Sequence, residues 1–136
     1  MLDLVTLQDA YDHLRIDADT SGSADDGWLA IFIPAISQAV ALWLKDDWRL
    51  YVPELDSDGE VVVNSDGDPI PELDSAGEPT AKPVVRAAVL IELASQYRYR
   101  EGEGKDNVMT PDAGYGYVLN KASTNLLTSL RRPTVA

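Results

Sequence analysis

Apolar residues recur at helical spacing in four segments of the chain, and this periodicity predicts four helices. The first helix should begin after Thr6, because Asp9 follows three residues later as an acidic variant of the capping box. Pro83 suits the first turn of the third helix, and Pro133 should stop the fourth. The expected helices cover 7–15, from 23–26 to 45–48, 83 to about 101, and about 117–131.

The second helix is the most apolar of the four. One stripe contains Leu29, Ile33, Ile36, Val40 and Trp43, and a second stripe beside it contains Trp28, Phe32, Ala35, Ala39 and Leu42. A helix that is apolar over so much of its circumference is either central in its domain or shared with a neighbouring subunit. Pro34 removes one backbone donor, so we expect a kink there.

The other helices each have a face that we expect to point inward. The residues on these faces are Leu7, Ala10, Tyr11 and Leu14 in the first helix; Val84, Ala87, Ala88, Leu90, Ile91, Leu93, Ala94, Ser95 and Tyr97 in the third; and Leu119, Ala122, Leu126, Leu127 and Leu130 in the fourth. Clusters of Asp, Ser, Thr and Gly predict loops over 16–26 and 102–116.

Residues 49–83 do not follow the helical pattern. The sequence PELDSDGE at 53–60 recurs as PELDSAGE at 71–78. Between the two copies, 61–63 are β-branched and 64–69 are turn-forming residues. We expect an inserted extended arm or a β-hairpin with strands near Glu60–Asn64 and Ile70–Leu73. The chain is therefore predicted to be mainly α: one domain over 1–136, a small bundle of about four helices with this insertion.

The net charge of −12 is concentrated in one segment, since residues 46–80 contain eleven acids and a single base, Arg49. An acidic chain does not bind nucleic acid by general attraction to phosphate, which requires Lys and Arg. The mildly basic residues 81–136 can instead attract the acidic segment of another subunit. The absence of cysteine excludes disulfides and thiolate metal sites. No apolar run was expected to reach the roughly 18 residues of a membrane span, so no membrane contact is predicted.

The sequence contains no pattern of residues that indicates a catalytic site. His13 is the only histidine, and its position four residues after Asp9 predicts a surface pair. No nucleophile elbow and no phosphate-binding loop is present, so we expect neither an enzyme nor a cofactor. The Asp-Gly turns at 56–59 and 64–68 resemble pieces of calcium loops without their full spacing, which leaves weak calcium binding as an alternative.

Aromatic and basic residues alternate over Tyr97, Arg98, Tyr99 and Arg100. This pattern can serve base stacking, complement the negative end of a helix, or dock an acidic partner.

Several short sequence motifs occur in an order that resembles one family, the head-tail connector (adaptor) proteins of tailed phages. They are Thr6-Leu7 with His13–Asp17, the pair Asp25-Asp26 before Trp28, an aliphatic helix over Ile33–Trp43, the proline-started Lys82–Leu90, Tyr97–Arg100, Leu126-Leu127 and Leu130–Pro133. Two features depart from the family pattern: Pro34, and an arm at 49–83 that is longer and more acidic than a plain loop.

The resemblance implies a structural virion protein at the head-tail junction, made in the host cytoplasm. Copies of the chain would form a homo-oligomeric ring, twelvefold in the virion, between the portal protein and a stopper or tail-completion protein, and DNA would pass through the ring without sequence-specific binding. Partner contacts are then expected at Arg98, Arg100, Arg131 and Arg132, with the two C-terminal arginines at the portal or the next ring. The acids expected to face the DNA channel or a neighbouring subunit are Glu54, Asp56, Asp58, Glu60, Asp66, Asp68, Glu72 and Asp74. The alternative function is a small acidic adaptor or regulatory module that binds a basic protein.

Overall fold

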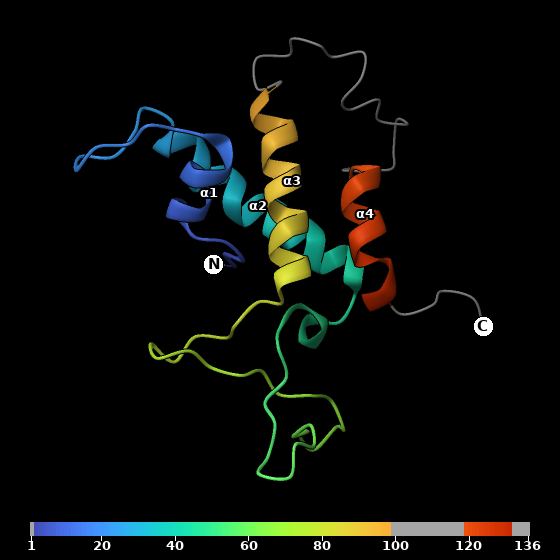
Figure 1. The fold of residues 1–136 in the computed structure, drawn as a ribbon. Coiled ribbons are helices and arrows are strands. Elements are labelled where there is room, and N and C mark those ends of the chain that lie inside the picture. The colour runs from blue at the N-terminus through green and yellow to red at the C-terminus, as the bar shows by residue number, and fades with distance from the viewer. Residues whose placement is uncertain (1, 99–118, 132–136) are drawn as a thin grey trace.

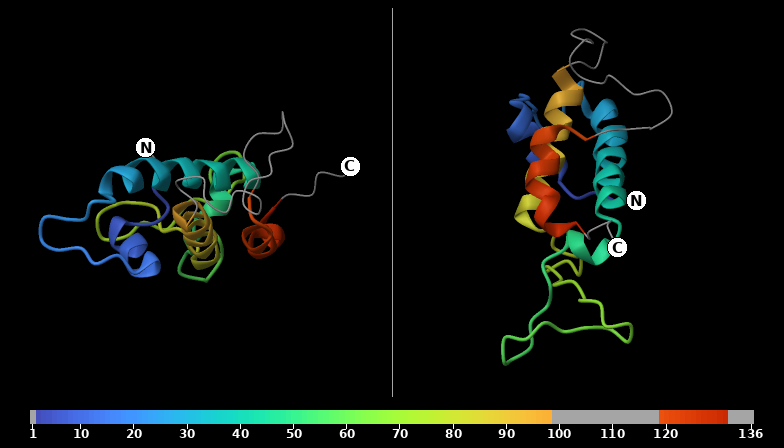
Figure 2. Two further views of the ribbon diagram at one scale, coloured as in Figure 1. Left: turned by 90° about the horizontal axis from the view of Figure 1, so that it is seen from above. Right: turned by 90° about the vertical axis from the view of Figure 1, so that its right-hand side faces the viewer.

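The computed structural model describes residues 2–98 and 119–131, and this part of the chain is mainly helical with four α-helices. The elements are α1 (Leu7–Leu14), α2 (Asp26–Leu44), the 3-10 turn η1 (Asp47–Leu50), α3 (Pro83–Arg98), α4 (Lys121–Leu127) and the 3-10 turn η2 (Thr128–Leu130). Helix α2 forms one layer, and α1, α3 and α4 lie together on one side of it (Figures 1 and 2). The predicted mainly helical architecture is confirmed.

The predicted helix bounds hold where a local signal sets them. Helix α1 ends at Leu14 because Arg15 adopts a left-handed conformation, with φ of 58°, that caps the helix. Helix α2 begins inside the predicted window and ends at Leu44, one residue before the predicted range of 45–48, and it continues through Pro34. Helix α4 begins at Lys121, later than predicted, because Asn120 is its N-cap in an extended conformation. The predicted loop at 102–116 and the predicted end of the third helix near 101 lie outside the described residues.

The core lies where the first stripe of α2 meets the other helices. Leu29, Ile33, Ile36 and Val40 are buried as predicted, and Trp43 is half-buried. The second stripe is different, because Ala35 and Leu42 are exposed on the opposite side of the helix, where none of the described residues covers them.

The predicted inward faces of the shorter helices are partly wrong. Helix α3 buries Val85, Ala88, Val89, Glu92 and Leu93, whereas predicted positions such as Val84 and Ala87 are half-buried. Its sequence is apolar on several sides, so periodicity alone does not select one face. In α4, Ser123 and Leu127 point inward while Ala122 and Leu126 are exposed, and Leu7 of α1 is also exposed.

Helix α2 is long and apolar enough, by length and composition, to cross a membrane, with a mean hydropathy of 1.7 over its most apolar 18 residues. The expectation that no apolar run reaches this length is therefore wrong. The structure buries 39% of that stretch inside the protein, and the core helix of a soluble protein meets the same criterion.

Residues 51–82, here called the arm, project from one end of the helices (Figures 1 and 2). Three tight turns are each closed by a single isolated β-bridge: Leu55 with Val61, Val63 with Pro69, and Leu73 with Pro79. The predicted β-hairpin is not found, and no strand forms in the described residues. Each turn interrupts the chain before successive residues can pair as a ladder, so the strands expected near Glu60–Asn64 and Ile70–Leu73 do not form.

The three turns share one local structure. Each opens with Asp56, Asn64 or Asp74, whose side-chain oxygen accepts hydrogen bonds from the backbone amides two and four residues later at 2.9–3.1 Å. The glycine three residues after each opening residue has φ of 81° or 82°, a conformation that other residues rarely adopt. The sequence repeat therefore has three copies, at 55–61, 63–69 and 73–79, and not two.

Backbone hydrogen bonds join the three turns into one unit. The amides of Glu54, Val62 and Ile70 form a closed triangle, in which each donates to a carbonyl of another member at 2.9–3.0 Å. A second triangle joins residues 52, 72 and 80 at 2.8–2.9 Å. The amide of Lys82 donates to the Leu50 carbonyl at 2.8 Å, which ties the base of the arm to η1.

Glu92 connects α3 to the start of α4 from inside the protein. Its side chain is fully buried, and its two carboxylate oxygens accept from the backbone amide and from the side-chain amide of Asn120, the latter at 3.1 Å. This contact lies 28 residues apart in sequence and positions α4 against α3.

We expect Glu92→Ala to lower the free energy of unfolding by about 1–3 kcal/mol, because it leaves two part-buried amide donors of Asn120 without this acceptor. Glu92→Gln keeps one side-chain oxygen as an acceptor and should lower it less. Urea denaturation followed by circular dichroism measures both. Equal midpoints for Glu92→Ala and the wild-type chain would contradict this role.

Candidate interaction surfaces

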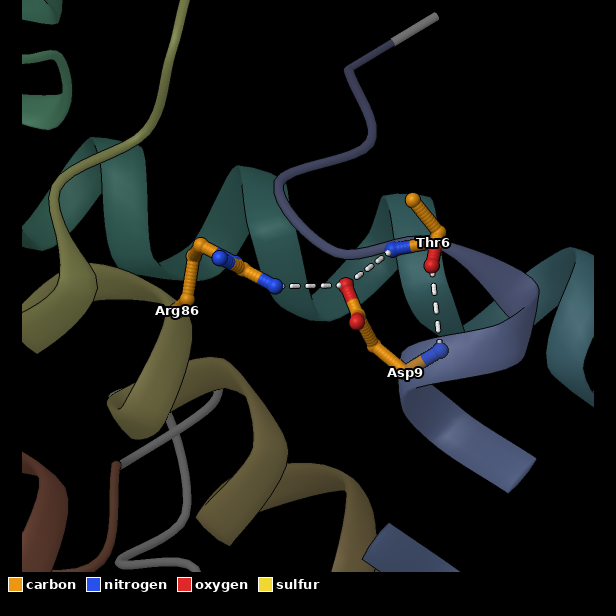
Figure 3. A network of polar contacts seen from close by, with 3 residues as sticks. All are labelled: Thr6, Asp9 and Arg86. Carbon is orange, nitrogen blue, oxygen red and sulfur yellow. Dashed lines mark hydrogen bonds and ion pairs between the residues drawn. The ribbon is translucent and has the colours of Figure 1, made fainter. Parts of the chain in front are cut away.

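The start of α1 is fixed by a polar network between α1 and α3 (Figure 3). The backbone amide of Thr6 and the guanidinium of Arg86 each donate to the Asp9 carboxylate at 3.0 Å, and the amide of Asp9 donates to the Thr6 hydroxyl at 3.0 Å. Burial raises the pKa of Asp9, but the hydrogen bonds from Thr6 and the charge of Arg86 together lower it below its usual value. The predicted capping box is confirmed.

The predicted surface pair between His13 and Asp9 is wrong. His13 is exposed, and among the described residues the carboxylate of Asp9 bonds to Thr6 and Arg86 instead. The spacing in the sequence paired His13 with the carboxylate of Asp9, but Arg86 of α3 forms the ion pair with that carboxylate.

Asp25, the N-cap of α2, and Asp26, its first residue, join the ends of three helices. The Tyr11 hydroxyl of α1 donates to Asp26, which also accepts from the Ser23 amide at 3.1 Å. The Tyr97 hydroxyl of α3 donates to Asp25 at 2.8 Å. This pair was noted in the sequence only for its place before the long helix, and the structure gives it a positioning role between α1, α2 and α3.

The contact with Asp26 raises the pKa of Tyr11 to about 12, through the hydrogen bond first, then burial, and then the negative charge of the carboxylate. An unfolded tyrosine releases its proton near pH 10. The stabilising contribution of Tyr11 is therefore complete below pH 10 and is lost as the pH rises through about 12.

We expect ultraviolet titration of phenolate formation to show a Tyr11 midpoint near pH 12, identified as the transition that is missing in Tyr11→Phe. Asp26→Asn should return this midpoint toward pH 10, because it removes the charge and weakens the acceptor. Asp17→Asn, which changes an exposed acid away from Tyr11, is the matched control. A midpoint that is the same with and without Asp26→Asn would contradict the assignment.

The first aromatic residue of the Tyr97–Arg100 motif, Tyr97, makes contacts within the protein, and Tyr99 lies outside the described residues. The ring of Tyr97 packs edge-on against Trp28 at 5.5 Å, and Trp28 stacks on Phe32 at 4.3 Å. With its hydroxyl bonded to Asp25, Tyr97 fastens the end of α3 to the start of α2. The structure therefore gives this tyrosine a packing role instead of the base-stacking role considered from the sequence.

The four arginines expected to bind partners do not form one cluster in the described residues. Arg98 lies at the end of α3, which Tyr97 places beside the start of α2. The guanidinium of Arg131 lies over the ring of Trp43, near the other end of α2, at 4.4 Å. Arg100 and Arg132 lie outside the described residues. Arg131 thus packs on its own α2, and the two described arginines lie at opposite ends of that helix.

The acids predicted to face a channel or a neighbour all lie on the arm. They are exposed except for Asp68, which is half-buried: Glu54, Asp56, Asp58, Glu60, Asp66, Asp68, Glu72 and Asp74. An oxygen of Asp56 and one of Asp74 accept hydrogen bonds from the backbone of their own turns. Among the described residues, no group of three His, Cys, Asp or Glu side chains is placed to hold a metal ion.

The outward side of α2 is an apolar surface that sequence reasoning did not separate from the core. Ile31 is 66% exposed and Leu42 is 70% exposed, and Ala35 between them is also exposed. Pro34, which is half-buried, lies at the edge of this apolar side. Contiguous exposed apolar residues of this kind mark sites of protein association. We call Ile31, Pro34, Ala35 and Leu42 the α2 stripe.

The chain matches no protein-family model, no curated protein and no solved structure. Its function is therefore inferred from the surfaces of this chain and from the resemblance of its sequence to the connector family.

Proposed function

We propose that this chain is a structural subunit of a tailed-phage head-tail connector. Copies of it form a ring that joins the portal to a stopper or tail component, and DNA passes through the centre. The α2 stripe is the observation that supports this most directly, because the described part of the chain folds around α2 and leaves an apolar side of it uncovered. A neighbouring subunit is the simplest cover for such a surface.

The acidic charge of the chain is compatible with DNA passage. Phosphate binding depends on Lys and Arg, and the arm presents exposed carboxylates such as Asp58 and Asp66. Where these acids line the channel, they repel the DNA backbone, so that DNA moves through without being held.

A second candidate function is a small acidic module that binds a basic protein. The exposed acids of the arm favour it, since a projecting acidic surface attracts a basic partner. The two candidates differ in their partner: the connector assembles with itself and with the portal, whereas the module binds one basic protein as a monomer.

We expect the full chain, mixed with the portal protein of the same genome, to form closed rings with twelvefold symmetry in negative-stain electron microscopy. The chain without portal is the control, because rings that need a template will appear only in the mixture. A chain that stays monomeric and does not bind the portal would contradict the connector role.

We expect Asp58→Lys with Asp66→Lys to slow DNA ejection from assembled particles, because the added positive charge attracts phosphate in the channel. The matched control reverses Asp12 and Asp17, which are exposed near α1. Ejection followed by fluorescence of released DNA measures the effect. Normal assembly and ejection in the arm variant would place these acids outside the channel.

A further inference from the structure

One face of the arm is apolar throughout. Successive residues in extended backbone point to opposite faces, and two bridged residues share a face. The five bridges of the arm pair odd-numbered residues with one another, which places all of these residues on the same face. The residues are Tyr51, Pro53, Leu55, Val61, Val63, Pro69, Pro71, Leu73, Pro79 and Ala81. None of them is polar apart from the tyrosine hydroxyl.

This face is here called the arm plate. Its outer part is exposed among the described residues, whereas Tyr51 and Ala81 at its base pack against the hydrophobic core. Leu55 is 56% exposed and Leu73 is 57% exposed, and Val61 and Val63 are exposed beside them. A hollow of about 650 Å³ is lined by residues 52–55 and 70–73, two segments of the arm that the Pro53–Pro71 bridge joins. The acids at the turns surround the plate. A surface with an apolar centre and a charged rim is typical of a protein interface.

The α2 stripe is the complementary surface on the same chain. Its four residues are apolar, the exposed Gln38 lies beside Leu42, and residues 27–44 contain no Asp, Glu, Lys or Arg. The acidic rim of the plate therefore meets no acid within residues 27–44, and acids flank the stripe at its margins, where Asp3 lies near Pro34 and Asp47 lies near Leu42 and the exposed Lys45. The plate and the stripe together contain Ile31, Leu42, Leu55, Val61, Val63 and Leu73, which are six of the eight large hydrophobic residues exposed in the described chain.

We propose that the arm plate of one copy packs on the α2 stripe of the next copy. Because the two surfaces differ, the contact is head-to-tail, and repetition of such a contact closes into a ring when the rotation allows it. This inference rests on the proposed connector function and specifies which surfaces join its subunits. It also gives a chain of high negative charge a way to associate with itself, because the contact is apolar at its centre and residues 27–44 of α2 carry no charge.

Two variants with one damaged surface each test the direction of the contact. Ile31→Glu damages the stripe, and Leu73→Glu damages the plate, since each buries a charge in an apolar contact. Alone, each should weaken self-association at least about tenfold, or about 1.4 kcal/mol. Mixed together, they should give defined dimers and no rings, because one intact plate meets one intact stripe.

Mass photometry and sedimentation velocity measure these species, and circular dichroism with urea denaturation checks that each variant is folded. Leu126→Glu is the matched control, because it places the same charge on an exposed leucine of α4 outside both surfaces. A mixture that contains no more dimer than either variant alone would overturn the proposal.

A cross-link tests the same contact without relying on the strength of association. The chain has no cysteine, so Leu42→Cys and Leu73→Cys introduce the only thiols. Mixed under mild oxidation, the two single variants should form the mixed disulfide in excess over either homodimer. Leu126→Cys mixed with Leu73→Cys is the control. Failure of the mixed disulfide to exceed the control would overturn the proposal.

The outcomes separate this inference from the connector function. Rings that form on the portal and are unaffected by Ile31→Glu and Leu73→Glu would leave the function standing and overturn the inference. Binding of the stopper protein to the plate, lost in Leu73→Glu while rings persist, would also overturn it. The mixed disulfide without any portal binding would support the contact and contradict the connector role.

Discussion

The fold depends on the burial of α2, a 19-residue helix that is apolar on nearly every side. One side provides the centre of the core through Leu29, Ile33 and Val40. The three shorter helices pack on that side, and no other element of the described residues covers the opposite side. Burial of apolar area is the main force that stabilises small domains, so the same residues that make the fold possible also leave a surface that favours association.

Polar contacts at the helix ends decide how the helices are aligned. Apolar packing is not directional, and it would tolerate several registers of α1 and α3 on α2. Asp25 and Asp26 each accept a tyrosine hydroxyl from a different helix, and Glu92 accepts both amides of Asn120. A shift of either helix by one turn would leave these partly or fully buried groups without their partners. The alignment of the bundle is therefore specified by a few carboxylates.

The sequence predicted what depends on neighbouring residues. The capping box of Thr6 and Asp9 was readable because its members lie three residues apart, and the core stripe of α2 was readable from its regular spacing. The buried face of α3 could not be predicted from its spacing, because this helix is apolar on several sides. Packing against the neighbouring helices decides that Val85 and Val89 are buried.

For the candidate site, the sequence located the acidic arm and the turn at 64–69. It did not reveal that this turn is a third copy of the repeat, since Asn64 replaces the aspartate that opens the other two. The paired bridges that align one apolar face join residues that are not adjacent in sequence. Likewise, the stacking of Arg131 on Trp43 could not be predicted, because the two residues lie far apart in the sequence and no local signal links them.

The closed base of the arm has a consequence for how such chains can diverge. Because the Lys82 amide bonds to the Leu50 carbonyl and Tyr51 bridges Ala81, the arm leaves and re-enters the helical body at nearly the same place. The contacts at the base hold the two ends of the arm together, and the entropic cost of closing a loop rises only slowly with its length. The number of residues in the arm can therefore vary with little effect on the start of α3. Descendants of this chain can therefore gain, lose or exchange whole turns of the arm while the helical body stays the same, and the reach of the subunit can evolve separately from its stability.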